Sequence, residues 1–180
     1  MRHVLTDLLK VSLKAASIED LQTIQKLFDF YLYDMSRFLG LEFQSGEGFL
    51  YPSDILMPYW RDQDHYPFII YCEMNGVWEI AGFSLLRNFP ENPQLYDIGQ
   101  FFVLQKFVGK GVGRAAFEQS VAKFKGSWQV RVFECNTPAA KFWKKAINEY
   151  SAGEYQSEVK SYQGKEMLFY RFNSRIEVSP

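Results

Sequence analysis

Residue types that carry common site chemistry are scarce in this chain. Cysteine occurs only at positions 72 and 135, and histidine only at positions 3 and 65. Two distant cysteines provide neither a zinc-binding spacing nor a disulfide framework, and two histidines argue against a histidine-based metal site or catalytic triad. We therefore expect no bound metal and a reducing, cytoplasmic setting.

Long apolar segments are also missing from the sequence. No run approaches the roughly 20 residues of a membrane-spanning helix, and the first residues lack the extended apolar region of a secretory signal. The 180 residues suffice for one domain over 1–180 with its own core, and the 18% aromatic content is typical of a packed globule. The expectation is a single domain without a membrane partner.

Charge is distributed unevenly along the chain, although the net charge is only −1. Residues 101–145 carry nine basic and two acidic residues, whereas residues 1–100 carry seven basic and fourteen acidic ones. The basic segment suits a polyanionic cofactor, and the acidic half would favour a cationic partner. Nucleic acid is not expected, because the chain as a whole lacks the basic footprint that neutralises phosphates.

Residues 103–114 form the most informative stretch, with the sequence VLQKFVGKGVGR. The pattern predicts a strand that runs through a glycine-rich turn into a helix. Gly109, Gly111 and Gly113 lack a Cβ atom, so backbone N–H groups there can approach a bulky anion. The first turn of a helix adds unpaired N–H donors and the positive end of the helix dipole. The stretch therefore predicts a pyrophosphate site.

Two common glycine motifs fit this turn poorly. A P-loop requires Ser or Thr after Gly-Lys, but here Gly109-Lys110 is followed by Gly111. A dinucleotide fingerprint requires G-x-G-x-x-G in the first βα turn and an acid about 20 residues later. Glu134 has roughly that spacing, but the glycines follow G-x-G-x-G and lie past the middle of the chain. A dinucleotide-binding enzyme is therefore the third choice.

The turn resembles the acyl-CoA pyrophosphate loop of the GNAT superfamily of N-acetyltransferases, which reads Gln/Arg-x-x-Gly-x-Gly/Ala. Val108 replaces the usual Gln or Arg, and the other positions agree. The resemblance implies acetyl-CoA as co-substrate, bound by Val108, Gly109, Lys110, Gly111, Val112, Gly113 and Arg114.

A second segment, Asn136 to Trp143, resembles the later GNAT motif Asn-x-x-Ala-x-x-Phe-Tyr and stands in the family's order. The resemblance implies that Asn136 reaches the pantetheine arm and that the helix carrying Ala139, Phe142 and Trp143 packs along CoA. Asn136 or Thr137 also suits the cap of this helix. Trp143 replaces a Tyr that often serves as general acid, and an indole N–H is no proton source at neutral pH.

Hydrophobic periodicity and turn signals predict the remaining elements. Strands are expected at 9–16, 68–73, 77–86, 96–104, 128–133, 150–161 and 167–172, and helices at 17–37, 54–60, 111–125 and from 138. Residues 40–51 are expected to form a loop. This order resembles the GNAT fold, a mixed α/β fold whose mostly antiparallel central sheet has helices on both faces. In that fold a splayed strand pair binds acyl-CoA.

The resemblance implies direct transfer of an acetyl group to an amine in a ternary complex. Counting back eleven residues from Val108, as in one branch of the family, gives Asp97 as the base, directly or through water. In another branch of the family the base stands nine residues before the loop, and that position is occupied by Gly99 in this chain. Backbone N–H groups near Phe102 and Val103 are candidates to stabilise the oxyanion, and Tyr96 or Tyr150 to protonate the thiolate, unless solvent does so.

The acceptor pocket is expected near the first helices, where aromatic and acidic side chains could hold an ammonium group. The candidates are Tyr59, Trp60 and Asp64, with Tyr51, Asp62 and His65 beside them. The function predicted is an N-acetyltransferase, monomeric or homodimeric, acting on a primary amine, with a cationic amine favoured by the charge distribution. The alternative is a catalytically degenerate module that binds acyl-CoA as a sensor or interaction domain.

Overall fold

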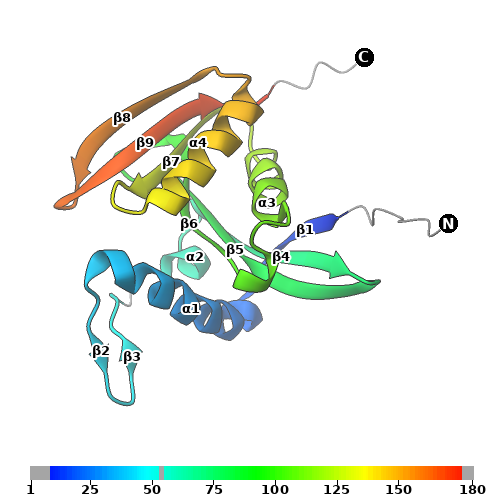
Figure 1. The fold of residues 1–180 in the computed structure, drawn as a ribbon, viewed down its shortest axis with the longest axis vertical. Helices are drawn as coiled ribbons and strands as arrows, with labels where there is room; N and C mark the ends of the chain where they lie inside the picture. Colours follow the sequence, from blue (N-terminus) through cyan, green and yellow to red (C-terminus); the bar gives the residue numbers. More distant parts are fainter. Residues whose placement is uncertain (1–8, 53–54, 176–180) are drawn as a thin grey trace.

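The computed structural model describes residues 9–52 and 55–175, which form a central twisted sheet covered by helices on both faces (Figure 1). Seven strands follow the order β1-β4-β5-β6-β7-β9-β8, and all neighbours are antiparallel except β6 and β7. Their bounds are β1 Lys10–Ala15, β4 His65–Met74, β5 Val77–Phe89, β6 Asn92–Val103, β7 Ser127–Phe133, β8 Tyr155–Tyr162 and β9 Lys165–Asn173. This is the mixed, mostly antiparallel sheet that the sequence predicted.

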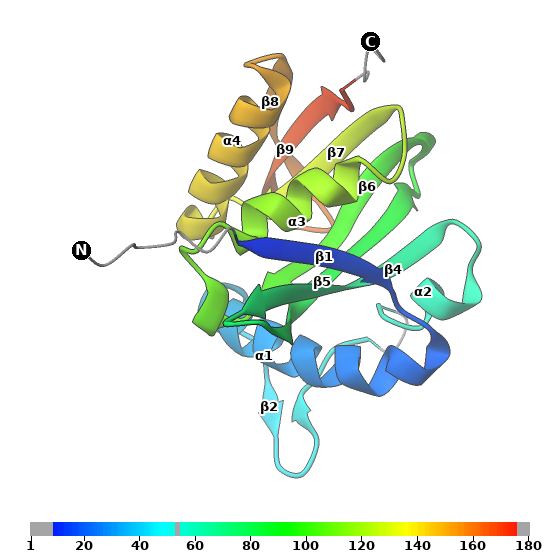
Figure 2. The same ribbon diagram turned by 90° about the vertical axis from the view of Figure 1, so that its right-hand side faces the viewer.

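Helices divide between the two faces of the sheet (Figure 2). The helix after the glycine turn and the helix after β7 pack on one face, around the buried rings of Phe117, Trp128 and Trp143. The long first helix packs on the other face, around Phe28, Phe83 and Phe102. The helical elements are η1 Ile18–Asp20, α1 Leu21–Leu39, α2 Pro58–Arg61, η2 Gln105–Phe107, α3 Val112–Val121 and α4 Thr137–Ser151.

Local signals account for several boundaries. Ser17 and Asp20 form a capping box at the start of η1, and Gly40 ends α1 in the left-handed conformation with φ +55°. Asn75 and Gly76 both have positive φ in the hairpin between β4 and β5, as a type I′ turn requires.

Several expected elements differ from the observed ones; β6, for example, begins at Asn92 rather than at residue 96, and α3 ends at Val121 rather than at residue 125. The segment expected as a loop holds a short hairpin, β2 (Phe43–Gln44) and β3 (Gly48–Phe49). Helix α2 begins at Pro58, and residues 53 and 54, where its start was expected, lie outside the described residues. Tyr150 lies in α4 because its ring continues the buried helical face of Trp143 and Ile147, so the next strand begins at Tyr155.

The parallel pair β6 and β7 separates partway along its length. Pairing between these strands covers Tyr96 to Ile98. On the other edge of β6, Leu85 pairs with Gln100 whereas Leu86 pairs with Ile98, so Gly99 is the extra residue of a β-bulge. A bulge bends its strand, and beyond Gly99 the edge of β6 diverges from β7. The two strands therefore form a V that opens toward the glycine turn.

Candidate active site

The open edge of β6 presents backbone groups to the gap. The Leu104 N–H donates to the Ala81 carbonyl oxygen on β5 at 2.8 Å. Because successive N–H groups of a strand point to opposite edges, the Phe102 N–H faces β5 and the Val103 N–H faces the gap. Of the two residues expected to stabilise an oxyanion, the geometry favours Val103. The Phe102 ring instead packs on Phe83 in the core beside α1.

The glycine turn lies at the end of β6 and leads directly into α3. Gly109 and Gly111 have φ of +76° and +85°, the left-handed region in which a branched residue is strained. A Cβ on Gly109 would meet nothing within 4 Å, and Lys110 between them is exposed. Helix α3 begins at Val112, so its first N–H groups lack intrahelical partners beside this open turn. An anion-binding cradle is therefore available.

Other residues of the turn have structural roles. Val112 is fully buried, and a Cβ on Gly113 would lie 3.3 Å from the Phe142 ring, so the third glycine permits close packing of α3 on α4. Arg114 pairs with Glu118 at 3.0 Å and with Glu149 at 2.7 Å, which directs its guanidinium along the helices. Val108 is 53% exposed and adds no polar contact.

The second motif forms the start of α4. The Asn136 side-chain oxygen accepts the Ala139 N–H at 3.2 Å, and its amide nitrogen lies 3.6 Å from the Met35 sulfur. Asn136 is thus the helix cap and lies next to α1. Trp143 is 6% exposed and contacts Phe101 and Phe117, a core position that a proton donor to the gap would not occupy.

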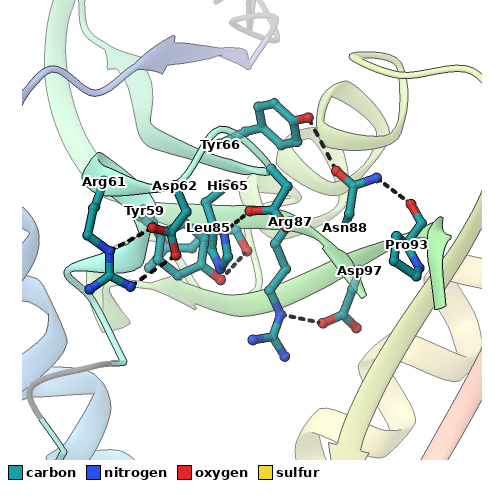
Figure 3. Close-up of polar contacts among 11 residues, drawn as sticks. Tyr59, Arg61, Asp62, His65, Tyr66, Leu85, Arg87, Asn88, Pro93 and Asp97 are labelled. Atoms are coloured by element: carbon teal, nitrogen blue, oxygen red, sulfur yellow. Dashed lines mark hydrogen bonds and ion pairs between the residues drawn. The ribbon is translucent and has the colours of Figure 1, made fainter. Parts of the chain in front are cut away.

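Asp97 lies on β6 in a fully buried position between two arginines. Its carboxylate accepts the Arg87 Nε–H at 3.0 Å and a forked pair from Arg131, Nε–H at 3.0 Å and Nη2–H at 2.7 Å. Figure 3 shows Arg87 reaching Asp97 from the neighbouring strand. Both carboxylate oxygens are thus engaged by guanidinium donors, so the contacts favour a positioning role.

Tyr96 points to the opposite face of the sheet. Its ring stacks on Phe124 at 4.9 Å and on Trp128 at 5.2 Å, within the core under α3. The prediction that Tyr96 takes part in proton transfer gains no support from this position.

Of the expected acceptor residues, Tyr59 places its side chain directly against β5 and β6. Its hydroxyl donates to the Leu85 carbonyl oxygen at 3.4 Å, and a Cβ on Gly99 would lie only 2.2 Å from that hydroxyl. The Tyr59 phenol therefore occupies the space of a side chain at position 99, where another family branch would carry its base. Burial raises the pKa of Tyr59 above its usual value, so this phenol stays protonated.

The remaining acceptor candidates lie farther out. The Trp60 indole donates to the Ser17 carbonyl oxygen at 2.8 Å, and exposed Asp64 lies 2.7 Å from the His65 ring nitrogen. Asp62, Asp64 and His65 come close enough for a metal ion, but acidic groups at a protein surface are common without one. Tyr51 packs edge-on against Phe28, beneath α1.

Sequence reasoning missed three members of the site. Arg131 on β7, Arg87 on β5 and Tyr31 on α1 surround the inner end of the gap, and burial raises the pKa of Tyr31 to about 12. For Arg131, the sequence did contain a signal: Gln129 and Arg131 alternate with the apolar residues of β7, which places both side chains on the same face of the sheet.

Comparison with solved structures defines the class of fold. An acetyltransferase from Thermus thermophilus superposes with a TM-score of 0.66 at 17% identity, covering 91% of this chain and 97% of that one. A domain from Methanocaldococcus jannaschii gives 0.64 at 13% identity over 92% and 99%. Spermidine N-acetyltransferase from Vibrio cholerae, solved with CoA and spermine, gives 0.60 at 14% identity over 91% and 95%.

The family follows from the sequence match. Residues 31–147 match the acetyltransferase (GNAT) family, and the chain belongs to that family. This span contains the glycine turn, the β6–β7 gap and the start of α4. No curated protein matches the chain in sequence. Among the described helices, none combines the length and apolar character needed to cross a membrane.

Proposed function

We propose that the protein is an acetyl-CoA-dependent N-acetyltransferase that acts on a primary amine. The observation that carries this proposal is the juxtaposition of the open glycine turn with the gap between β6 and β7. The turn would hold the pyrophosphate on the backbone of Gly109 and Gly111 and on the first turn of α3. The pantetheine would enter the gap, with its thioester near the inner end.

The reaction forms a C–N bond to the amine and breaks the C–S bond of the thioester. The neutral amine attacks the thioester carbonyl carbon, and the resulting oxyanion accepts a hydrogen bond from the Val103 N–H on the gap edge. The tetrahedral intermediate then collapses with cleavage of the C–S bond. The products are the N-acetyl amine and the CoA thiolate, and the proton of the amine goes to water.

Water is the proton acceptor because the ionisable groups at the inner end do not suit the task. Asp97 is occupied by Arg87 and Arg131, and the raised pKa of Tyr59 and Tyr31 keeps both phenols protonated. The thiolate likewise takes its proton from solvent. Tyr96 is stacked in the core, and the Tyr150 hydroxyl accepts the Arg175 backbone N–H at 3.0 Å.

The role of Asp97 as a base stays a prediction, and Asp97→Asn separates the two roles. In either role, Asp97→Asn should lower thermal stability, because two guanidiniums lose their shared anion. The loss of a base would lower kcat for every amine acceptor alike, whereas the loss of a positioning residue would act mainly on the KM of the acceptor.

A binding-only module is the second candidate, and the departures at Val108, Gly99 and Trp143 favour it. Titration calorimetry with acetyl-CoA, with NAD and ATP as controls, tests the cofactor that both candidates require. Gly111→Val should abolish binding, whereas the matched Gly164→Val, at φ +74° in the distant β8–β9 turn, should leave it intact. Thiol release that depends on an added amine then distinguishes the enzyme from the module.

A cationic acceptor and a monomeric or homodimeric state also stay predictions. The acid-rich first half of the chain and the likeness to spermidine N-acetyltransferase support a cationic amine. An amine screen that begins with spermidine tests the first prediction, and sedimentation velocity tests the second.

A further inference from the structure

The inner end of the β6–β7 gap carries an excess of positive charge. Arg87 and Arg131 share one carboxylate, that of Asp97, and neither forms another ion pair within residues 9–52 and 55–175. Asp97 is fully buried, and the side chains of Arg131 and Arg87 are only 8% and 21% exposed. The nearby phenols of Tyr31 and Tyr59 stay neutral because burial raises their pKa. The cluster therefore has a net charge of +1.

The polar neighbours of the cluster do not cancel this charge. The Gln129 amide lies 3.5 Å from Asp97 and accepts the Arg171 Nε–H at 3.2 Å. Arg171 is itself paired with Glu158 at 3.2 Å, in a partly exposed position. Gln129 thus connects the cluster to a neutral pair and adds no negative charge to it.

The two arginines also retain unused donors. Arg87 donates to Asp97 through Nε alone, and Arg131 through Nε and Nη2. In the described part of the chain no side-chain or backbone acceptor meets the Nη1 atom of Arg131 or either terminal nitrogen of Arg87. A guanidinium presents its N–H groups in a planar fork that matches a carboxylate. A second carboxylate would balance both the charge and the donors.

The cluster lies where an acceptor must enter. Arg131 follows Val130, the last β7 residue paired with β6, so it stands where the gap opens, across from Gly99. The Arg131 guanidinium lies over the Tyr162 ring at 4.8 Å and over the Phe89 ring at 5.3 Å, which holds it at this position. A Cβ on Gly99 would lie 2.2 Å from the Tyr59 hydroxyl of α2 and 3.3 Å from the Arg87 Nε of β5, so both side chains adjoin Gly99.

We propose that the acceptor is an amine that also carries a carboxylate, such as an amino acid, and that Arg87 and Arg131 bind this carboxylate while Asp97 positions them. The proposal rests on the N-acetyltransferase function argued above. The positive charge at the inner end of the gap lies next to the acceptor, so it is a better guide to the acceptor than the acidic excess of the first hundred residues. A polyamine would bring its positive charge to a site that already holds an uncompensated cation.

The test uses matched acceptor pairs with the full chain and acetyl-CoA. Each pair joins an amino acid to the amine that lacks its carboxylate, such as phenylalanine with phenethylamine or leucine with 3-methylbutylamine, and spermidine is added as a separate arm. We expect at least one α-amino acid to exceed its partner in kcat/KM by about 100-fold, the scale of a bidentate charged contact. Preference for the decarboxylated amines or for spermidine would overturn the proposal.

Two variants test whether the arginine cluster is responsible for the preference for an acceptor that carries a carboxylate. Arg87→Gln should raise KM for the preferred amino acid by about 10- to 100-fold and lower the preference over its decarboxylated partner by a similar factor. Lys125→Gln, which removes an exposed charge beyond α3, is the matched control and should change neither. Equal losses for both members of a pair would assign Arg87 a purely structural role and overturn the proposal.

Binding separates failure of the proposal from failure of the proposed function. Absence of acetyl-CoA binding would refute the transferase itself. If CoA binds but no acceptor reacts, the N-acetyl products are titrated into the CoA complex. Binding of an N-acetyl amino acid, weakened in Arg87→Gln, would support the carboxylate site, whereas no preference over the N-acetyl amine would refute it.

Discussion

The contact between Gly99 and Tyr59 permits a double-variant test of the site geometry. A Cβ at position 99 would lie 2.2 Å from the Tyr59 hydroxyl oxygen, 3.3 Å from the Arg87 Nε and 3.4 Å from the Leu85 carbonyl oxygen. The Tyr59 side chain is 4% exposed and packs edge-on to His65, so it has little room to withdraw. Gly99→Ala should therefore force a rearrangement centred on the phenol.

The expected magnitude follows from overpacking. Adding one methyl group to a packed site costs about 1–3 kcal/mol, and the reduced freedom of the unfolded chain offsets about 0.4–1 kcal/mol. Gly99→Ala should thus lose about 1–2 kcal/mol, which corresponds to roughly 2–8 °C in melting temperature for a chain of this length. Tyr59→Phe removes the clashing oxygen and one long hydrogen bond, at a cost of about 1 kcal/mol.

The informative quantity is the coupling between the two changes. Chemical denaturation of wild type, both single variants and the double variant gives this energy directly. We expect the double variant to be more stable than the sum of the single losses predicts, by at least about 1 kcal/mol. Full wild-type stability of Gly99→Ala, or additive losses, would show that the phenol does not occupy the space above Gly99.

Three further predictions concern other parts of the site. Gly111→Val should abolish acetyl-CoA binding with little unfolding, and unchanged affinity in calorimetry would contradict the cradle. Asn136→Ala should lower the free energy of unfolding by about 1 kcal/mol through loss of the α4 cap, with weaker CoA binding only if the side chain also contacts the pantetheine. The pKa of Tyr31 is raised to about 12 from 10.0, so its stabilising effect is complete below pH 10 and is lost as pH rises toward 12. Denaturant titrations between about pH 9.5 and 11.5 measure this loss. The free energy of unfolding of Tyr31→Phe should fall less over this range than that of the wild type. The control Tyr33→Phe, which changes an exposed tyrosine, should behave like the wild type.

The sequence determined the features that depend on neighbouring residues. The glycine turn before α3 and the Asn136 cap of α4 follow from short-range backbone needs, positive φ in one case and unpaired N–H groups in the other. The order of strands and helices followed from periodicity, and with the two motifs it was enough to predict the fold, which the family match confirmed.

Only the tertiary structure decided the chemistry at the inner end of the gap. Arg87, Asp97 and Arg131 come from three different strands, and their contacts depend on the registers of β5 with β6 and of β6 with β7. The bulge at Gly99 shifts the register of β5 with β6, and the Tyr59 phenol reaches Gly99 from α2. No local pattern encodes such long-range pairings, because each partner is fixed by the packing of the whole sheet. The charges that meet in space, rather than their totals along the chain, are therefore the basis of the proposed acceptor site.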